Sequence, residues 1–498
     1  MNADRRALRI AIGAGLALPA LSILGESLGP HELDPPPVPD EWAYASLPPL
    51  PRTETAAPKP VGPIRRDEVS IPVRGAVLEG TMLAPREPGR YPAVVFVHGA
   101  GPGHRSGLLD QAEYLASAGI VALLYDKRTV GYSFANRDFG LLADDALAAV
   151  RLLRRRPDVD PDRVGLWGVS EGGWVVPIAA ARSSDVAFAI LVSAPNVSPQ
   201  SQAAWEFDDH LRRMSAPEGL RRAMIIALSM GEFGYSHHDP APALEGMLQP
   251  VLALYGTHDR AIPLVQSARV LEEALLPGAG TIRFFDRADH DLHVGDGFAP
   301  GYLETMANWV LALPATAAPA PDQQIAGTAP HQDRRAVEPP EAPTYATAPV
   351  LVGALALAAA GYLAGPVAAR LARRGGRGQA IDPRLPDRWR PLRRLLRHNA
   401  AAGISSTLLM NLLIGLVVAS VLLERGSSPI AHGGWFVVRS AALAALVLEV
   451  AAIDTTVSSV RAGWRPSRAH AVAVIGVIGA TGIVLVVDAY MGLFAPRW

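Results

Sequence analysis

Residues 164–181 read VGLWGVSEGGWVVPIAAA and contain the pattern G-x-S-x-G at Gly168–Gly172. The apolar run before the pattern is typical of a buried strand, and the run after it is typical of a helix. Ser170 is therefore expected at a sharp strand-to-helix turn that exposes its hydroxyl group, and the small residues on either side let the backbone close there. The same pattern at Gly25–Gly29 ends an apolar N-terminal run and follows no predicted strand. Ser170 is the candidate nucleophile.

A serine hydroxyl needs a general base to activate it and a third group to hold that base. Behind a G-x-S-x-G turn the acid and then the histidine follow along the chain. Asp259 comes after the apolar run Val251–Tyr255, and His290 comes after the next run, Thr281–Phe285. We therefore expect Asp259 and His290 to complete a triad. Two alternatives stay open at this point, namely Asp259 as a helix N-cap and His293 as the base.

Acyl chemistry also needs N–H donors aimed at the oxygen that becomes negatively charged. The backbone N–H of Glu171, directly after the candidate nucleophile, is one expected donor. The second is expected from the glycine-rich loop HGAGPG at His98–Gly103, where Ala100 is the candidate. The alternative for this loop is a simple glycine-rich turn, and His98 is expected to be structural.

Composition excludes several other kinds of site. The sequence has no Cys, which rules out disulfides, thiolate ligands and a cysteine nucleophile. Neither His237–Asp239 nor Asp289–Asp291 has a spacing that places three ligands on one face, so no metal and no cofactor is predicted. A formal net charge of -1 argues against nucleic acid as a partner.

Strand-like and helix-like segments alternate between about residues 64 and 313, which predicts a mostly parallel sheet covered by helices on both faces. Residues 199–249 contain helical segments and no strand, so we expect a small helical cap there. Pro-rich segments at 30–63 and 314–348 flank the region. Because such compositions bury little apolar surface, they are expected to be an extended spacer and a linker.

Three blocks in the same order resemble α/β-hydrolase esterases and serine aminopeptidase-like or acyl-thioesterase-like hydrolases. These blocks are Val94–Arg105, YDKRTVGYS at Tyr125–Ser133, and Val164–Ala181. The resemblance covers about residues 68–313. It departs from the common pattern at Thr129, where relatives usually carry Gly.

The resemblance implies an α/β-hydrolase fold with a mostly parallel sheet and a small helical cap. It also implies a triad of Ser170, Asp259 and His290. By the same resemblance, the backbone N–H groups of Ala100 and Glu171 form the oxyanion hole. It does not identify the substrate, because this fold supports many chemistries.

Both ends of the chain are apolar, and the mean hydropathy is +0.18. Three Arg residues precede the apolar run Ile10–Leu24, which predicts a signal peptide or an N-terminal anchor over residues 1–29. Each C-terminal run is close to the ~20 residues that a helix needs to cross a bilayer. The predicted four transmembrane helices within 349–498 correspond to the runs 349–369, 401–423, 435–457 and 471–494.

Charges between these runs predict an orientation. Ten Arg residues lie from Arg370 to Arg397, between the first and second runs, and three more lie from Arg461 to Arg468. The connection between the second and third runs has only Glu424 and Arg425. Because basic loops stay in the cytoplasm, the sequence predicts a multi-pass protein of the cell membrane with its hydrolase-like region on the extracytoplasmic side.

The combined expectation is a serine hydrolase, similar to carboxylesterases, that cleaves a carboxylic ester or related acyl bond through an acyl-enzyme. The expected partners are a small-molecule or lipid-like acyl substrate and the lipid bilayer. An acyltransferase or a peptidase with the same triad, or a catalytically silent ligand-binding domain, are the alternatives. Within the spans we also expect an Arg439–Asp488 ion pair and a Glu449–Asn411 hydrogen bond. The alternative for the first pair is that Arg439 extends to the lipid headgroups and Asp488 reaches water.

Overall fold

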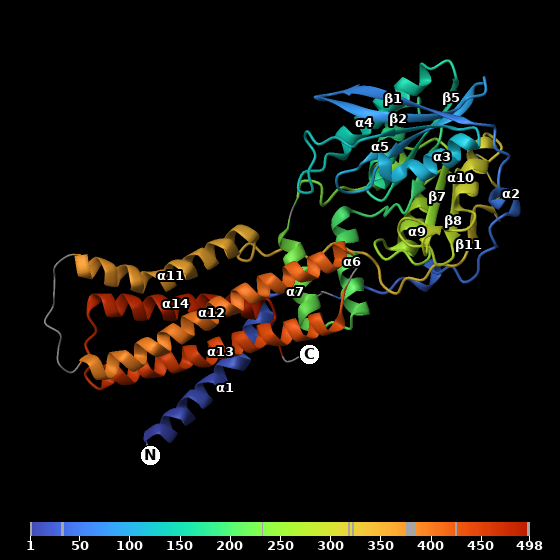
Figure 1. The fold of residues 1–498 in the computed structure, drawn as a ribbon. Coiled ribbons are helices and arrows are strands. Elements are labelled where there is room, and N and C mark those ends of the chain that lie inside the picture. Colours follow the sequence, from blue (N-terminus) through green and yellow to red (C-terminus); the bar gives the residue numbers. More distant parts are fainter. Residues whose placement is uncertain are drawn as a thin grey trace. The chain divides into compact units, whose positions relative to one another are not determined.

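The computed structural model describes residues 2–30, 34–231, 233–316, 319–320, 323–374, 385–423 and 426–495. The chain divides into two compact units, whose ribbons are drawn in Figure 1. The first, which we call the α/β unit, consists of Pro35–Glu206 and Phe233–Glu338. The second, the helical unit, consists of Met1–Asp34, Phe207–Glu232 and Pro339–Trp498.

A nine-stranded sheet forms the centre of the α/β unit as the structure describes it, in the order β1-β2-β4-β3-β5-β6-β7-β8-β11. Only the pairings β1/β2 and β2/β4 are antiparallel, so the predicted mostly parallel sheet is confirmed. The strands are β1 (Ile64–Val73), β2 (Ala76–Pro85), β3 (Tyr91–Val97), β4 (Val121–Tyr125), β5 (Val159–Val169), β6 (Ala189–Val192), β7 (Val251–Gly256), β8 (Gly280–Phe285) and β11 (Ile325–Gly327). A separate short hairpin pairs β9 (His293–Val294) with β10 (Gly297–Phe298).

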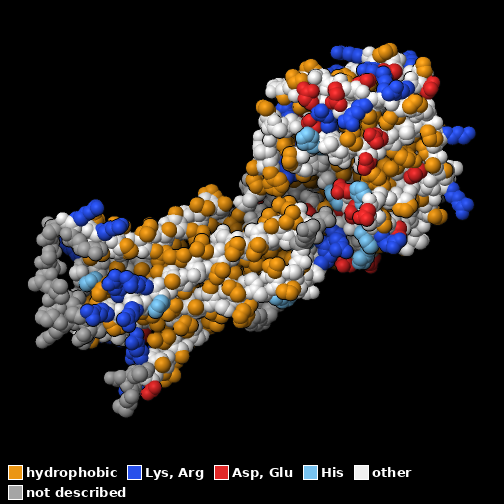
Figure 2. Space-filling view, in the orientation of Figure 1, with side chains coloured by type: hydrophobic (Ala, Val, Ile, Leu, Met, Phe, Trp, Pro, Cys, Tyr) orange, Lys and Arg blue, Asp and Glu red, His pale blue; other side chains and the backbone are white. Residues whose placement is uncertain are grey.

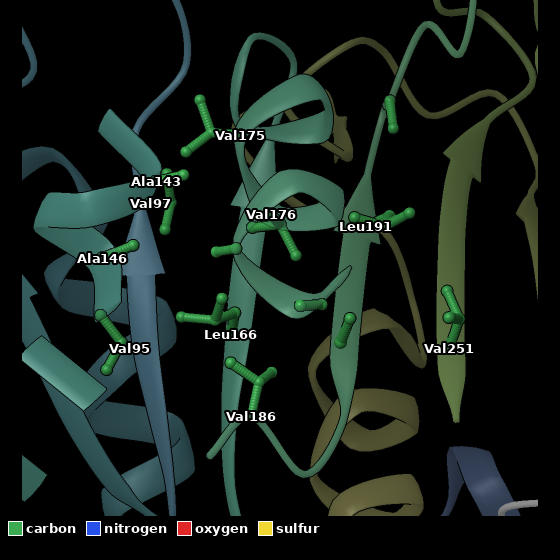
Figure 3. Close-up of a cluster of buried hydrophobic side chains, with 14 of the residues drawn as sticks. Val95, Val97, Ala143, Ala146, Leu166, Val175, Val176, Val186, Leu191 and Val251 are labelled. Carbon is green, nitrogen blue, oxygen red and sulfur yellow. The ribbon is translucent and has the colours of Figure 1, made fainter. Parts of the chain in front are cut away.

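Helices cover both faces of this sheet. The helices α4 (Phe139–Arg154), α5 (Gly172–Arg182) and α9 (Leu264–Ala274) pack on one face, while α3 (Leu109–Ser117) and α10 (Tyr302–Leu311) pack on the other. Successive side chains of a strand point to opposite faces, so Val95 joins the first cluster and its neighbour Phe96 joins the second. Figure 3 shows part of the first cluster, in which Leu166 of β5 lies among side chains of the helices and of neighbouring strands. Each such buried aliphatic side chain contributes about 1.5–3 kcal/mol.

The N-terminal Pro-rich segment is folded onto the α/β unit, so the prediction of an extended spacer was wrong. It contains the one-turn helices η1 (Asp40–Trp42) and α2 (Arg52–Thr55). Glu54 of α2 accepts two hydrogen bonds of 2.7 Å from Arg283, a β8 residue with no exposed surface. Tyr44 of the same segment is buried in the core of the unit, and Asn308 donates to the carbonyls of Glu54 and Ala56. Composition alone could not reveal this docking, because it depends on single contacts rather than on a periodic apolar face.

The predicted linker is also part of this unit from residue 323 to Glu338. Its strand β11 pairs in parallel with β8 and satisfies backbone groups that an edge strand would otherwise leave open. Further along, the amide of Gln332 accepts a hydrogen bond of 3.1 Å from the backbone of Gln266. The α/β unit therefore reaches beyond the predicted range of 64–313 at both ends.

The helical unit contains long apolar helices. Among the described residues, five are long and apolar enough to cross a membrane, judged by length and composition, and four of these are C-terminal as predicted. They are α1 (Asn2–Leu28), α11 (Ala348–Arg374), α12 (Leu385–Leu422), α13 (Ser428–Arg461) and α14 (Arg468–Tyr490). Figure 2 shows hydrophobic side chains over the visible face of this unit and Lys or Arg side chains gathered at one end of it. Gly375–Arg384, Glu424 and Arg425, which enter the charge argument, lie outside the described residues.

The predicted cap at 199–249 is divided between the two units, which corrects the expectation of one small cap. The inserted helices are α6 (Pro199–Arg213), α7 (Glu218–Met230) and α8 (Ala241–Glu245). Residues 207–232, which include α7, belong to the helical unit. There α7 packs so closely on α13 that a Cβ atom on Gly219 would lie 2.4 Å from the Trp435 ring. Segments 199–206 and 233–249 remain with the α/β unit.

The polar pairs predicted inside the helical unit were wrong. Arg439 donates hydrogen bonds of 3.0 and 2.8 Å to the backbone carbonyls of Leu493 and Ala495. Asp488 and Glu449 instead accept hydrogen bonds from side chains of α12. Asn399, the partner of Glu449, lies before the predicted run because α12 begins at Leu385 rather than near residue 401. The partner of Asp488 is Ser406, within that run.

The Glu54–Arg283 pair yields a stability prediction. Glu54→Ala leaves a buried guanidinium without its carboxylate, and removing one partner of a buried ion pair costs about 3–5 kcal/mol. We expect the lower end, about 3 kcal/mol, because Arg283 keeps its hydrogen bonds to the carbonyls of Ile282 and Gln324. Urea denaturation of the full chain in detergent, followed by tryptophan fluorescence, measures the change.

The matched control is Glu41→Ala, an exposed residue of the same Pro-rich segment. Its effect on the free energy of unfolding should stay within about 0.5 kcal/mol. Equal small effects of the two substitutions would contradict the docking of this segment through Glu54.

Candidate active site

Ser170 lies at the sharp turn that the sequence predicts. Strand β5 ends at Val169 and helix α5 begins at Gly172, and Ser170 between them has a φ of 52°. This left-handed conformation is strained for a residue with a side chain and is common at functional sites. The turn is closed by hydrogen bonds from Ser170 N to the Val192 carbonyl (3.0 Å) and from Gly173 N to the Ser170 carbonyl (2.8 Å).

The glycines on either side of Ser170 are needed because backbone atoms approach closely here. A Cβ atom on Gly168 would lie 2.6 Å from the Gly172 carbonyl oxygen. A Cβ atom on Gly172 would lie 2.8 Å from the carbonyl oxygen of Val97 on the neighbouring strand β3. Either side chain would force the turn open, so the G-x-S-x-G pattern follows directly from local packing.

Asp259 and His290 are joined by a hydrogen bond. His290 Nδ1 lies 2.8 Å from Asp259 Oδ2, and the other carboxylate oxygen accepts a bond of 2.9 Å from the Ala261 N–H. Asp259 follows β7, His290 follows β8, and Ser170 follows β5 of the same parallel set. All three therefore come from the carboxyl edge of the sheet, where ligands and catalytic groups of open α/β sheets gather.

The two alternative readings of these residues do not match the structure. Pro263, not Asp259, occupies the N-cap position of α9. His293 stacks on Phe298 with ring centroids 4.4 Å apart, and its backbone N–H donates to Asp289. The histidine that contacts Asp259 is thus His290.

The protonation of His290 depends on its acidic neighbours. Burial alone lowers the pKa of His290, but the charge of Asp259 and its hydrogen bond outweigh that effect. The carboxylates of Asp291 and Glu206 act in the same direction, and together they raise the pKa of His290 to about 9. The imidazole is consequently held in its charged form more strongly than a free histidine would be.

The side chain of Glu171 is the centre of a buried polar cluster that the sequence analysis missed. Its carboxylate pairs with Lys127 and with Arg137 (2.9 Å), and it accepts a bond of 3.0 Å from the Tyr132 hydroxyl. Lys127 also donates to the Gly99 carbonyl at 2.7 Å. We call these four side chains, Glu171, Lys127, Arg137 and Tyr132, the Glu171 cluster.

The Glu171 cluster connects the two loops that carry the predicted oxyanion donors. Glu171 follows Ser170 directly, and Gly99 immediately precedes Ala100, which is exposed. The Tyr132 hydroxyl additionally accepts a hydrogen bond of 3.1 Å from Gly101 N. A signal was present in the YDKRTVGYS block, which contains Lys127 and Tyr132, but nothing in the sequence indicated that both would reach Glu171.

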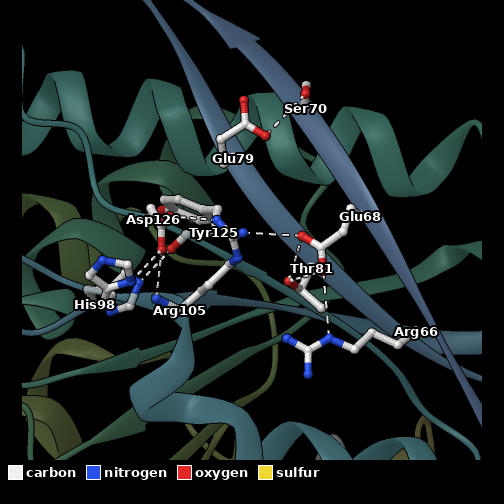
Figure 4. Close-up of polar contacts among 10 residues, drawn as sticks. Arg66, Glu68, Ser70, Glu79, Thr81, His98, Arg105, Tyr125 and Asp126 are labelled. Atoms are coloured by element: carbon white, nitrogen blue, oxygen red, sulfur yellow. Dashed lines mark hydrogen bonds and ion pairs between the residues drawn. The ribbon is translucent and has the colours of Figure 1, made fainter.

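Neighbouring contacts fix the glycine-rich loop at its two ends. At one end, the buried His98 ring lies 2.6 Å, through Nε2, from the Tyr125 carbonyl oxygen, which agrees with a structural role. At the other end, Arg105 donates to Asp126 at 2.5 Å and to Glu68 at 3.2 Å, as Figure 4 shows. The loop between them is thereby held against β4 and the β1–β2 hairpin.

Within the described residues, no group of three or more His, Asp or Glu side chains could hold a metal ion. In the predicted cap, His237 lies 3.0 Å from Glu338. His238 packs edge-on against the ring of Phe139.

Comparison with known proteins finds similarity over the α/β unit. Residues 111–309 match the prolyl oligopeptidase family. Esterase EstD of Thermotoga maritima is 27% identical over 275 residues, which cover 49% of this chain and 65% of that protein. The polyketide transferase grgF of a Penicillium species is 30% identical over 203 residues, which cover 40% of this chain and 60% of that protein. The chain thus spans less than two thirds of the length of either relative.

Among solved structures, a putative dienelactone hydrolase from Klebsiella pneumoniae is similar over 51% of this chain and 98% of that chain, with 18% identity and a TM-score of 0.35. Three observations agree on the fold: the order of the sheet, the strand-turn-helix at Ser170, and the matched family and relatives. The chain therefore has an α/β-hydrolase fold, followed by a C-terminal region of apolar helices.

Proposed function

We propose that this chain is a membrane-tethered serine hydrolase that cleaves a carboxylic ester or a related acyl bond of a small or lipid-like substrate. The observation that carries the proposal is the Asp259–His290 hydrogen bond at the sheet edge where Ser170 occupies its strained turn. In this proposal Ser170 is the nucleophile, His290 the general base and acid, and Asp259 the group that orients His290.

The proposed reaction has two halves. His290 takes the hydroxyl proton while Ser170 Oγ bonds to the acyl carbon, and the resulting oxyanion accepts hydrogen bonds from the N–H groups of Glu171 and Ala100. His290 then returns the proton to the leaving group as its bond to the acyl carbon breaks, which leaves an acyl-enzyme. Water, activated by His290, releases the acid in the second half.

Acyl transfer to an acceptor other than water is a second candidate, favoured by the similarity to a polyketide transferase. Peptide cleavage is favoured by the match to the prolyl oligopeptidase family. Both use the same acyl-enzyme. Product analysis separates the three. Ester hydrolysis releases p-nitrophenol and the free acid, peptide cleavage releases the amine of an aminoacyl amide, and transfer gives a new ester with an added alcohol.

We further propose that the α/β unit lies on the extracytoplasmic side. Two described segments support this orientation: the start of α12, which carries Arg390, Arg393, Arg394 and Arg397, and the connection from α13 to α14, which carries Arg465. Basic segments stay in the cytoplasm, which places the opposite ends of these helices outside.

The triad assignment is tested by substitution. Ser170→Ala should abolish labelling by a fluorophosphonate probe and all ester hydrolysis. His290→Ala should lower kcat by several orders of magnitude because the base is lost, while His293→Ala should leave it nearly unchanged. Stopped assays on the purified full chain with p-nitrophenyl esters measure the hydrolysis rate of the Ser170 variant and the kcat of both histidine variants. Labelling that survives Ser170→Ala would refute the nucleophile, and the reverse result for the two histidines would move the base to His293.

A pH profile tests the electrostatics of His290. Only the neutral imidazole can accept the serine proton, and its raised pKa is about 9. We therefore expect kcat/KM to increase about tenfold per pH unit up to that value and to level off above it. Asp259→Asn removes the main source of the increase, so its residual activity should level off at lower pH. A profile that is already flat at neutral pH would show that Asp259 does not raise the pKa of His290.

The Glu171 cluster predicts a role for Lys127. Lys127→Met removes the bonds to Glu171, Gly99 and Tyr132, so both proposed oxyanion donors lose support. The expected result is a decrease in kcat of about 10²-fold with little change in KM, since the oxyanion exists only beyond the ground state. Lys59→Met, at the only other lysine, which is exposed, is the matched control. A loss of folding without a kcat effect in the folded fraction would reduce Lys127 to a structural role.

Cysteine labelling tests the orientation, because the chain has no Cys. A Ser427→Cys variant, between α12 and α13, should react with a membrane-impermeant maleimide in intact cells. A Pro466→Cys variant, between α13 and α14, should react only after permeabilisation. The opposite pattern would invert the orientation of the helical unit.

A further inference from the structure

Two carboxyl groups are enclosed in the helical unit without a cation beside them. Glu449 of α13 and Asp488 of α14 are 6% and 4% exposed. Within the part of the chain that the structure describes, neither forms an ion pair. Asp454, one turn further along α13, differs: it lies 3.0 Å from Arg9 and its side chain is 18% exposed. Both groups therefore differ from Asp454, which is a paired and partly exposed carboxylate of α13.

Both groups meet neutral donors on a single face of α12. Asn399 Nδ2 donates to Glu449 at 2.5 Å, and Ser406 Oγ donates to Asp488 at 2.7 Å. Asn399 and Ser406 have no exposed surface, and they are two helical turns apart. Gly403 lies between them on the same face of α12.

A tyrosine fills the space in front of Gly403. The hydroxyl oxygen of Tyr362, on α11, would lie 2.2 Å from a Cβ atom on Gly403, and it is 3.2 Å from the hydroxyl of Thr481 on α14. Polar side chains thus follow the α12 face from Asn399 to Ser406, and we call this set the polar row: Glu449, Asn399, Tyr362, Thr481, Ser406 and Asp488. Its members come from four helices.

Energetics favour the acid form of both carboxyl groups. Enclosing an ionised carboxylate costs several kcal/mol, whereas a hydrogen bond from a neutral group to a charged one returns about 1.5–3 kcal/mol. Protonation removes the charge and turns the acceptor into a donor. A single neutral donor per carboxyl, as seen at Glu449 and Asp488, therefore fits a carboxylic acid better than a carboxylate.

A second observation indicates that Glu449 is protonated. Oδ1 of Asn399 is buried and has no hydrogen-bond donor in the structure. Unpaired buried acceptors are rare because they cost about 1–3 kcal/mol. A protonated Glu449 supplies the missing donor, since an amide and a carboxylic acid can form two antiparallel hydrogen bonds. The vacancy at Asn399 is thus complementary to a proton on Glu449.

We propose that the helical unit binds protons at Glu449 and Asp488, the two ends of the polar row, and exchanges them with solvent. Uptake forms one O–H bond on a carboxylate oxygen with a proton taken from solvent, and release breaks it again. No electron transfer or co-reactant is involved.

Other titratable groups of the packed helices are accounted for. Tyr362 of α11 faces the row, and Arg6 and Arg9 of α1 contact Asp454 and Thr455 instead. At the start of α14, His470 stacks on Trp389 with centroids 4.0 Å apart. On α12, the basic residues nearest to Asn399 are exposed, namely Arg393, Arg394, Arg397 and His398. None of these described groups neutralises the two carboxyls.

Infrared spectroscopy of the full chain in liposomes tests the proposal, because a protonated carboxyl has its own C=O stretching band. We expect bands that shift in D2O and that lose intensity only above the pH range in which ordinary carboxyls ionise. Glu449→Gln and Asp488→Asn, which keep the hydrogen-bond acceptor, should each remove one band. The control is Asp454→Asn, on the same helix as Glu449, which should leave both bands in place.

Two results overturn the proposal. The absence of such bands would mean that both groups are ionised. Bands that disappear in the variants but neither titrate nor exchange in D2O would mean that the protons are fixed and the row is only structural. If a variant fails to fold, carboxyl-13C labelling of Glu or of Asp in the unchanged chain shifts the corresponding band and assigns it without any substitution.

Discussion

The close approach of the backbone around Ser170 is the constraint on which the α/β unit depends. Gly168 and Gly172 have no room for a side chain, and the turn between them joins the central strand β5 to α5. That same turn is bonded to β6 through the Val192 carbonyl. Because β5 to β8 are consecutive neighbours in a parallel sheet, fixing the end of β5 also fixes where residues after β7 and β8 emerge. The Asp259–His290 pair is the consequence of this topology.

The parts of the fold that follow from periodic burial could be predicted from the sequence. Alternation in β3 and the long apolar runs of α11 to α14 are patterns visible in the sequence. Residues after strand ends correctly indicated that Asp259 contacts His290 and that Ser170 follows a strand of the same parallel set. The errors arose where one specific contact replaces a pattern. Glu54 holds a Pro-rich segment by pairing with Arg283, and β11 adds a strand of three residues. Neither leaves a periodic signal, so both segments resembled linkers.

The insertion between β6 and β7 illustrates a related limit. Its helical character was visible in the sequence, but the partner of α7 was not, because an apolar helix face is equally suited to any apolar surface. Residues such as Leu220 and Met224 belong to one cluster with Trp435 and Val438 of α13. An amphipathic pattern predicts that a face is buried but does not identify the surface that covers it. The boundary between the units crosses α6, where no change of composition marks it.

Buried carboxyl groups show how their surroundings decide their chemistry. Glu171, 1% exposed, pairs with Lys127 and Arg137 and accepts a hydrogen bond from Tyr132, so it can anchor two loops. Glu449 and Asp488 are almost as enclosed but meet only an amide and a hydroxyl, and a charge there has nothing to balance it. The same side-chain chemistry therefore gives a permanent structural charge in one unit and a proton-binding group in the other. The number of cations within reach, rather than the depth of burial, separates the two cases.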